Sequence, residues 1–293
     1  MRQVTLGVVQ MACGADRDAN LAEAEGSVRA AAAQGANIVV LQELFETPYF
    51  CPDKKPAHFD LARRFDGNSM VERMSRLASE LGVVLPVSFF EQSGADYFNA
   101  LATIDADGSV LGLYRKSHIP EGPGYEEKHY FKSGDTGFVV CDTRFGRLGA
   151  AICWDQWFPE CARALTLRGA EILVYPSAIG NEPQDPDLDS RHHWRRVMQG
   201  HAAANMVPLA AANRVGTEQH DSATMTFYGS SFIADGYGAV VAEAPDDAPA
   251  IITASFDLDQ LAEQRRSWGL FRDRRPDLYD ILTQPGRRPD LED

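Results

Sequence analysis

Short apolar runs alternate with longer amphipathic segments along most of this chain. The apolar runs predict strands at 4–11, 36–43, 82–92, 99–116, 137–143, 147–153, 170–178, 207–216, 228–235 and 238–244. The segments between them predict helices at 18–35, 68–82, 158–170 and 189–206. Strands that alternate with helices in this way, with added hairpins, are typical of an α/β fold in which helices cover mixed sheets.

Turn and loop signals divide these elements without dividing the chain. Asp107 and Gly108 predict a hairpin turn inside 99–116. The proline-containing stretches 121–135 and 180–190 lie between recognisable elements, so we interpret them as functional loops of one domain covering 1–293. Residues 268–293 lack a clear core pattern, and we expect a C-terminal tail that wraps a neighbouring subunit.

Composition and charge narrow the class of protein. The hydrophobic fraction of 44% is enough for a substantial core, and the formal charge of −14 argues against nucleic acid as the main partner. The first 14 residues indicate a strand, not a signal peptide, and no stretch predicts a membrane span. An odd number of scattered cysteines fits reduced thiols in a cytoplasm. They are Cys13, Cys51, Cys141, Cys153 and Cys161.

Cys153 is placed where a strand gives way to a helix. The apolar run 148–152 precedes it, and Pro159 with Glu160 is typical of a first helical turn. Positive backbone dipoles at such a turn are expected to lower the pKa of the thiol and favour the nucleophilic thiolate. Because free cysteines are often buried, Cys153 could instead be an ordinary core residue. Other residues of the chain must distinguish a nucleophile from a core residue.

Two more polar residues end apolar runs, Glu43 after 38–42 and Lys116 after 109–115. Either residue alone is explained by a strand end at the surface, where a charged side chain is exposed to solvent. Together with Cys153 they supply a base, a cation and a nucleophile. A thiol that attacks a carbonyl must give up its proton, which Glu43 can accept. Lys116 and the backbone N–H of Trp154 can then stabilise the oxyanion.

The motifs LQELF, LGLYRKSHIP and AAICWDQWFPE, in this order, resemble those of the nitrilase superfamily of carbon–nitrogen hydrolases. The resemblance implies a four-layer α-β-β-α sandwich, with Glu43 as general base, Lys116 as oxyanion stabiliser and Cys153 as nucleophile. It also implies a second catalytic glutamate after the lysine. Glu127 matches that position best, and Glu126 is the alternative.

Longer stretches, among them 114–138 and 177–214, resemble the branch that hydrolyses N-carbamoylputrescine to putrescine, carbon dioxide and ammonia in polyamine biosynthesis. The resemblance implies a carbamoyl-enzyme intermediate on the cysteine. The acidic loop 182–189 independently suits a small cationic substrate, although such loops are usually solvated surface. By resemblance, Glu182 is the residue that reaches the free amine of the substrate.

Another N-carbamoyl compound, such as N-carbamoyl-β-alanine or a carbamoyl amino acid, is the alternative substrate class. Its carboxylate would favour an arginine partner, and Arg191, Arg195 and Arg196 are present. Their spacing fits better with a solvent face or a subunit contact of one helix.

Metal and cofactor chemistry are not expected. His192, His193 and His201 form no recognisable ligand motif, and the glycines form no phosphate-binding signature. A binding or scaffolding member of the fold that has lost turnover is the alternative class, and the presence of all three triad residues argues against it. The resemblance also implies a homo-oligomer, a dimer or a larger even assembly built through helices near the nucleophile.

Overall fold

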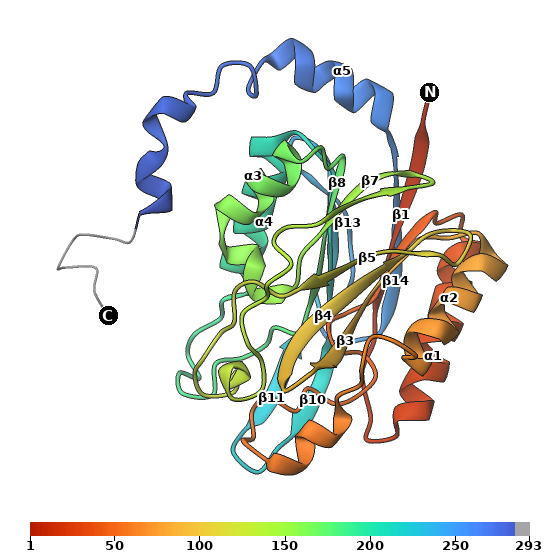
Figure 1. Cartoon of the computed structure of the whole chain (residues 1–293), viewed down its shortest axis with the longest axis vertical. Helices are drawn as coiled ribbons and strands as arrows, with labels where there is room; N and C mark the ends of the chain where they lie inside the picture. Colours follow the sequence, from red (N-terminus) through yellow and green to blue (C-terminus); the bar gives the residue numbers. More distant parts are fainter. Residues whose placement is uncertain (285–293) are drawn as a thin grey trace.

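Two sheets lie face to face at the centre of the structure, a computed structural model that describes residues 1–284 (Figure 1). In the first sheet, a parallel bridge between Ile38 and Val84 joins two three-stranded parts. One part has the order β14 (Ala250–Asp257), β1 (Gln3–Gln10), β2 (Ile38–Val40), and the other has the order β3 (Leu85–Ser93), β4 (Asp96–Ile104), β5 (Val110–Arg115). The second sheet has the order β13 (Val240–Glu243), β12 (Phe232–Ala234), β9 (Leu209–Asn213), β8 (Ile172–Ser177), β7 (Gly146–Ala150), β6 (Val140–Thr143).

Helices cover the outer face of each sheet (Figure 1). The first sheet is covered by α1 (Arg17–Ala33) and α2 (Ser69–Leu81), and the second by α3 (Pro159–Leu167) and α4 (Arg191–Asn205). Asp16 caps α1 and Asn68 caps α2, since each side chain accepts hydrogen bonds from the first turn of its helix. The predicted α/β fold and its four-layer α-β-β-α sandwich are confirmed.

The alternation of β1 divides the core in two. Val4, Leu6 and Val8 pack between the sheets, whereas Val9 belongs to the cluster under α1 and α2. Gly7 also faces the helix layer, where an added Cβ would approach the Cβ of Ala36 to 2.8 Å. The close packing of β1 against the turn that follows α1 therefore requires glycine at this position.

Four elements go beyond the sequence prediction. They are the hairpin strands β10 (Val215–Gln219) and β11 (Thr224–Tyr228), the edge strand β14, and helix α5 (Leu258–Trp268). The hairpin is rich in polar residues, and β14 is half-exposed along most of its length, so neither has the apolar run used to predict strands.

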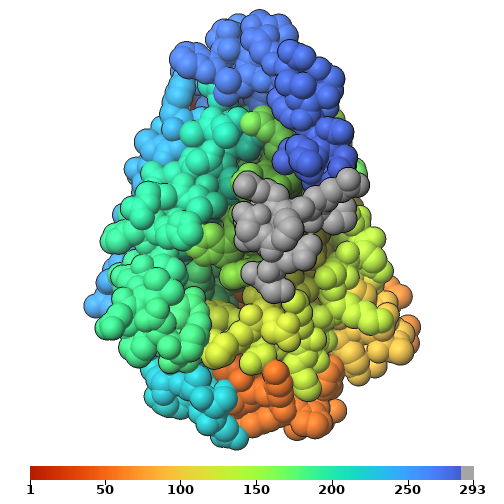
Figure 2. Space-filling view, turned by 90° about the vertical axis from the view of Figure 1, so that its left-hand side faces the viewer, coloured from red at the N-terminus to blue at the C-terminus, as the bar shows by residue number. Residues whose placement is uncertain are grey.

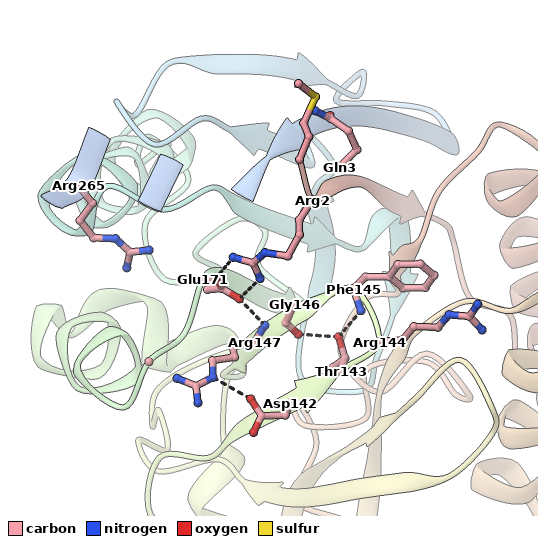
Figure 3. A pocket seen from close by; sticks show the side chains of 12 residues that line it. Arg2, Gln3, Asp142, Thr143, Arg144, Phe145, Gly146, Arg147, Glu171 and Arg265 are labelled. Carbon is pink, nitrogen blue, oxygen red and sulfur yellow. Dashed lines mark hydrogen bonds and ion pairs between the residues drawn. The ribbon is translucent and has the colours of Figure 1, made fainter. Parts of the chain in front are cut away.

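The parallel strands give the molecule two different ends, one at the carboxyl ends of the strands and one at their amino ends. β1 runs parallel to β2, and β7, β8 and β9 run parallel to one another, so their carboxyl ends lie at common sheet edges. Near the opposite end, where β1 and β7 begin, Arg2 forms a bidentate ion pair with Glu171 beside a hollow of about 750 Å³ (Figure 3). Glu43 and Cys153 follow the carboxyl ends of β2 and β7, which is where ligands bind in open α/β sheets.

The segment after α5 continues over the α3 side of the molecule, as the left-hand face in Figure 2 shows. Its described part has two short 3₁₀ turns, Pro276–Leu278 and Asp280–Thr283, with Leu278, Ile281 and Leu282 largely exposed. Residues 285–293 of the predicted tail lie outside the described residues. The single domain over 1–293, and a tail over 268–293 that wraps a neighbour, stay predictions. Within 1–284, no helix is long and apolar enough to cross a membrane.

Candidate active site

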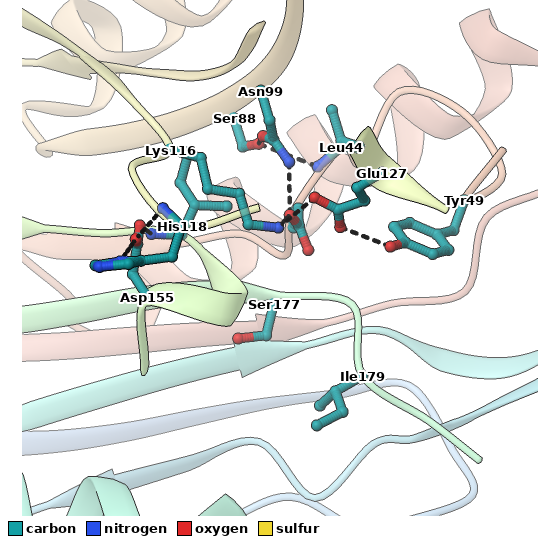
Figure 4. A network of polar contacts seen from close by, with 12 residues as sticks. Leu44, Tyr49, Ser88, Asn99, Lys116, His118, Glu127, Asp155, Ser177 and Ile179 are labelled. Carbon is teal, nitrogen blue, oxygen red and sulfur yellow. Dashed lines mark hydrogen bonds and ion pairs between the residues drawn. The ribbon is translucent and has the colours of Figure 1, made fainter. Parts of the chain in front are cut away.

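Lys116 lies with two glutamates in a fully buried polar cluster (Figure 4), and Cys153 lies within electrostatic range of it. Lys116, directly after β5, places Nζ 2.8 Å from Oε1 of Glu43 and 2.6 Å from Oε2 of Glu127. All three side chains are completely buried. The two carboxylates raise the pKa of Lys116 well above its usual value against the opposing effect of burial, so the ammonium stays charged.

Glu43 uses only one of its two carboxylate oxygens in this network. Oε1 accepts from Lys116 and, at 2.6 Å, from Nδ2 of Asn99 in β4. Oε2 is buried and has no hydrogen-bond partner within residues 1–284. A buried carboxylate oxygen without a partner is costly, and here it is the atom left free to accept a proton.

Glu127, and not Glu126, is the second glutamate of the cluster. Glu127 contacts Lys116 and accepts from the Tyr49 hydroxyl at 2.6 Å, whereas the adjacent Glu126 pairs with Lys54 near the surface at 2.8 Å. Burial raises the pKa of Glu127 to about 7, with the Glu43 charge adding to it and Lys116 opposing it.

Cys153 lies in a strained turn beside these charges. It opens the 3₁₀ turn Cys153–Trp157 between β7 and α3 with φ of +42°, a left-handed conformation that is uncommon for a residue with a side chain. The thiol is nearly buried, with 5% of the residue exposed.

The expectation that this turn lowers the pKa of the thiol is wrong. Burial, and then the charge of Glu43, raise the pKa of Cys153 well above its usual value, although Lys116 opposes them. The desolvation of a buried thiolate outweighs the backbone dipoles. The thiol is therefore protonated near pH 7 and needs a base, which the free oxygen of Glu43 can supply.

Asp155 ties the nucleophile turn to the lysine loop. This fully buried carboxylate accepts from the backbone N–H of Ile152 at 3.0 Å, from the Tyr114 hydroxyl at 2.7 Å and from the backbone N–H of His118 at 3.0 Å. Trp154, beside it in the same turn, is 38% exposed, and the oxyanion role of its backbone N–H stays a prediction.

Sequence reasoning missed Asn99, Tyr49 and Asp155 as members of this network. Their partners lie 56, 78 and 37 residues away in the chain, so local pattern gives no direct sign of the contacts. The one available signal is a polar residue inside or beside an apolar run, as at Asn99.

Glu182 lies on the loop after β8, outside the buried cluster. It is half-buried, burial raises its pKa, and Oε2 accepts weakly from the Gln184 side chain at 3.3 Å. Burial raises the pKa of Tyr125 against a hydrogen bond from the backbone N–H of Gly180, and the charges of Glu182 and of an ionised Cys153 add to the rise. Tyr125 therefore lies within electrostatic range of both the loop carboxylate and the nucleophile.

The arginines and histidines of α4 are placed elsewhere. Arg191 pairs with Asp246 at 2.6 Å and Arg195 pairs with Glu243, while Arg196 is exposed. His192 and His193 are exposed, and Nε2 of the buried His201 lies 2.7 Å from the backbone carbonyl of Gln156. In the described part of the chain, no three His, Cys, Asp or Glu side chains are arranged to hold a metal ion.

This fold and this cluster define an amide hydrolase of the nitrilase superfamily. The carbon-nitrogen hydrolase family model matches residues 5–266, and the chain belongs to that family. A crystal structure of a carbon-nitrogen hydrolase from Helicobacter pylori G27 superposes with a TM-score of 0.90 at 40% identity, over 96% of this chain and 99% of that one.

Two curated relatives are similar over nearly the whole chain. The N-carbamoylputrescine amidase of Arabidopsis thaliana is 57% identical, over 96% of this chain and 95% of the relative. The citrullinase of Francisella tularensis is 51% identical, over 97% of this chain and 99% of the relative.

Proposed function

We propose that this chain hydrolyses N-carbamoylputrescine to putrescine, carbon dioxide and ammonia, a step of polyamine biosynthesis. The observation that carries the proposal is the enclosed cluster of Glu43, Lys116 and Glu127 beside the Cys153 thiol. The relatives named N-carbamoylputrescine amidase, at 54–57% identity, support the substrate.

The first half of the reaction forms a carbamoyl-enzyme. The thiol of Cys153 gives its proton to the free Oε2 of Glu43, and Sγ attacks the ureido carbonyl carbon. Lys116 has three N–H donors and uses two on the carboxylates, which leaves one for the oxyanion. The intermediate collapses when the C–N bond to putrescine breaks and Glu43 returns the proton to the departing amine.

The second half releases the carbamoyl group from the sulfur. Glu43, again unprotonated, takes a proton from water as the water oxygen attacks the carbonyl carbon. The C–S bond breaks, Cys153 recovers its proton, and the released carbamic acid divides into carbon dioxide and ammonia. Glu127 keeps Lys116 oriented between the two carboxylates throughout.

Glu182 supplies the proposed preference for a cation. Its half-buried carboxylate lies on the loop that leads from β8, near Tyr125, where the terminal ammonium of the substrate can reach it. A carboxylate removed from water binds an ammonium more strongly than an exposed one does.

Citrulline is the second candidate substrate, on the strength of the citrullinase relative. Citrulline carries an extra carboxylate on the carbon that bears the ammonium. Of the three candidates to bind that carboxylate, Arg196 is exposed to solvent, and Arg191 and Arg195 already pair with Asp246 and Glu243. Their occupied guanidinium groups favour N-carbamoylputrescine.

Glu182→Gln is expected to raise KM for N-carbamoylputrescine by about 10- to 100-fold and to change kcat less, because the lost charge pair serves ground state and transition state alike. Ammonia release should be measured for N-carbamoylputrescine, citrulline, N-carbamoyl-β-alanine and N-butylurea, the neutral analogue. The wild type should use N-butylurea poorly, and the variant should change that rate little.

Asp187→Asn is the matched control, because Asp187 lies on the same loop but is exposed. It should leave KM near the wild-type value. A wild type that prefers N-carbamoyl-β-alanine, which has no ammonium, would refute the ammonium site. A wild type that prefers citrulline would refute N-carbamoylputrescine as the substrate, and either result would make Arg191 the next residue to replace.

We further propose a cytoplasmic homo-oligomer of even subunit number. Leu278, Ile281 and Leu282 are exposed on the segment after α5, where Leu282 lines a hollow with residues of α3 and α4, and a second subunit would cover them. Light scattering should give an even multiple of 32.2 kDa, which Ile281→Glu with Leu282→Glu should lower. A monomeric wild type would refute the assembly. The five free thiols support a reducing compartment, and cell fractionation tests it.

A further inference from the structure

A buried ion pair lies behind the active-site cluster. Arg214 directly follows β9, and its side chain is completely buried. Its Nη1 donates to Oε1 of Glu218 in β10 at 2.7 Å. The charge of Glu218 contributes to a raised pKa of Arg214 against the effect of burial, so the guanidinium stays charged. A buried pair of this kind contributes little net stability in many proteins, and its use is often to fix one conformation.

The other N–H groups of Arg214 hold the loop that carries Glu43. Nη2 donates to the backbone carbonyls of Glu43 at 3.1 Å and Leu44 at 2.9 Å, and Nη1 donates to that of Thr47 at 3.0 Å. Leu44 has φ of +50°, so the backbone turns sharply and unfavourably directly after Glu43. The turn places these carbonyls on one side of the loop, where the guanidinium donates hydrogen bonds to them.

Glu218, the other half of the pair, reaches Glu127 through one residue. Its Oε2 accepts from the backbone N–H of Tyr49 at 2.7 Å. The Tyr49 hydroxyl donates to Oε1 of Glu127 at 2.6 Å. The two ends of the ion pair therefore lead to the two carboxylates that hold Lys116.

We propose that the Arg214–Glu218 ion pair is a positioning device that sets both active-site glutamates, Glu43 through its backbone and Glu127 through Tyr49. This inference rests on the roles given to Glu43 and Glu127 in the proposed function. It predicts that a planar, forked cation is required at residue 214, because one side chain must reach three carbonyls and one carboxylate. A lysine keeps the charge but cannot make all four contacts.

The test is Arg214→Lys, read out in two ways. The kcat for ammonia release should fall by about 10- to 100-fold with KM within about threefold of wild type, since misplacing the base affects the chemical step. Alkylation of Cys153 by iodoacetamide, which needs no substrate, should slow at pH 7 and recover only at higher pH. In the Glu43→Gln background, Arg214→Lys should slow alkylation little further, because the base through which it acts is gone.

Glu218→Gln is the second variant, chosen because it keeps the shape of the side chain. Like Arg214→Lys, it should reduce kcat. Arg73→Lys is the control, because Arg73 also forms a bidentate ion pair, with Glu25, but that pair is more exposed and lies between α1 and α2, away from the active site. It should leave kcat and alkylation unchanged.

Three results would overturn the positioning role. They are unchanged kcat in both variants, an equal slowing of alkylation with and without Glu43, and variants that lose activity only because they do not fold by circular dichroism. A wild type that is inactive on N-carbamoylputrescine but shows the alkylation pattern would refute the proposed substrate and leave the ion-pair inference standing.

Discussion

Cys153→Ala is expected to abolish ammonia release from N-carbamoylputrescine while the protein stays folded. The sulfur is the atom that forms and breaks the bond to the carbamoyl group, so no other side chain of the cluster can replace it. Loss of a nucleophile removes about 10⁶-fold in kcat where it acts as one unit with its base. Stopped assays of ammonia and putrescine, with circular dichroism for folding, measure both parts of the expectation.

Cys161→Ala is the matched control, because Cys161 is also buried but lies in α3, outside the polar cluster. It should keep kcat near wild type and cost some stability through the small cavity it leaves. Activity above about 1% of wild type in Cys153→Ala, removed by a chelator, would instead favour metal-dependent hydrolysis.

The sequence predicted the site residues that lie at the ends of apolar strands. Glu43, Lys116 and Cys153 each end an apolar run, and strands that end at one side of layered sheets bring such residues together. Which of two adjacent residues enters the site is harder to predict from the sequence. Whether Glu126 or Glu127 enters the site depends on the backbone of the short turn Glu127–His129, which no periodicity describes.

The remaining parts of the site depend on contacts that are distant in the chain. Arg214 holds carbonyls about 170 residues away, and its sequence context is an ordinary strand end. The direction in which the pKa of Cys153 is shifted could also be determined only from the structure. The sequence shows the dipoles of the turn, but burial and the Glu43 charge, which decide the outcome, come from other elements.

Glu43→Gln is expected to lower kcat by at least ~100-fold, the usual scale for a lost general base. The amide oxygen can still accept from Lys116 and Asn99, so the variant should keep the local structure. The NH₂ group would then stand where Oε2 now lies, and it cannot take the proton of Cys153. Steady-state kinetics of ammonia release, with a thermal melt for folding, measure the loss.

Lys116→Ala should lower kcat at least as much, because it removes the cation that faces the oxyanion and leaves Glu43 and Glu127 without their shared partner. Glu126→Gln is the control for both variants, since Glu126 pairs with Lys54 at the rim and should tolerate neutralisation. Near-normal kcat in Glu43→Gln would show that another group deprotonates Cys153. The same result in Lys116→Ala would leave the oxyanion to backbone N–H groups such as that of Trp154.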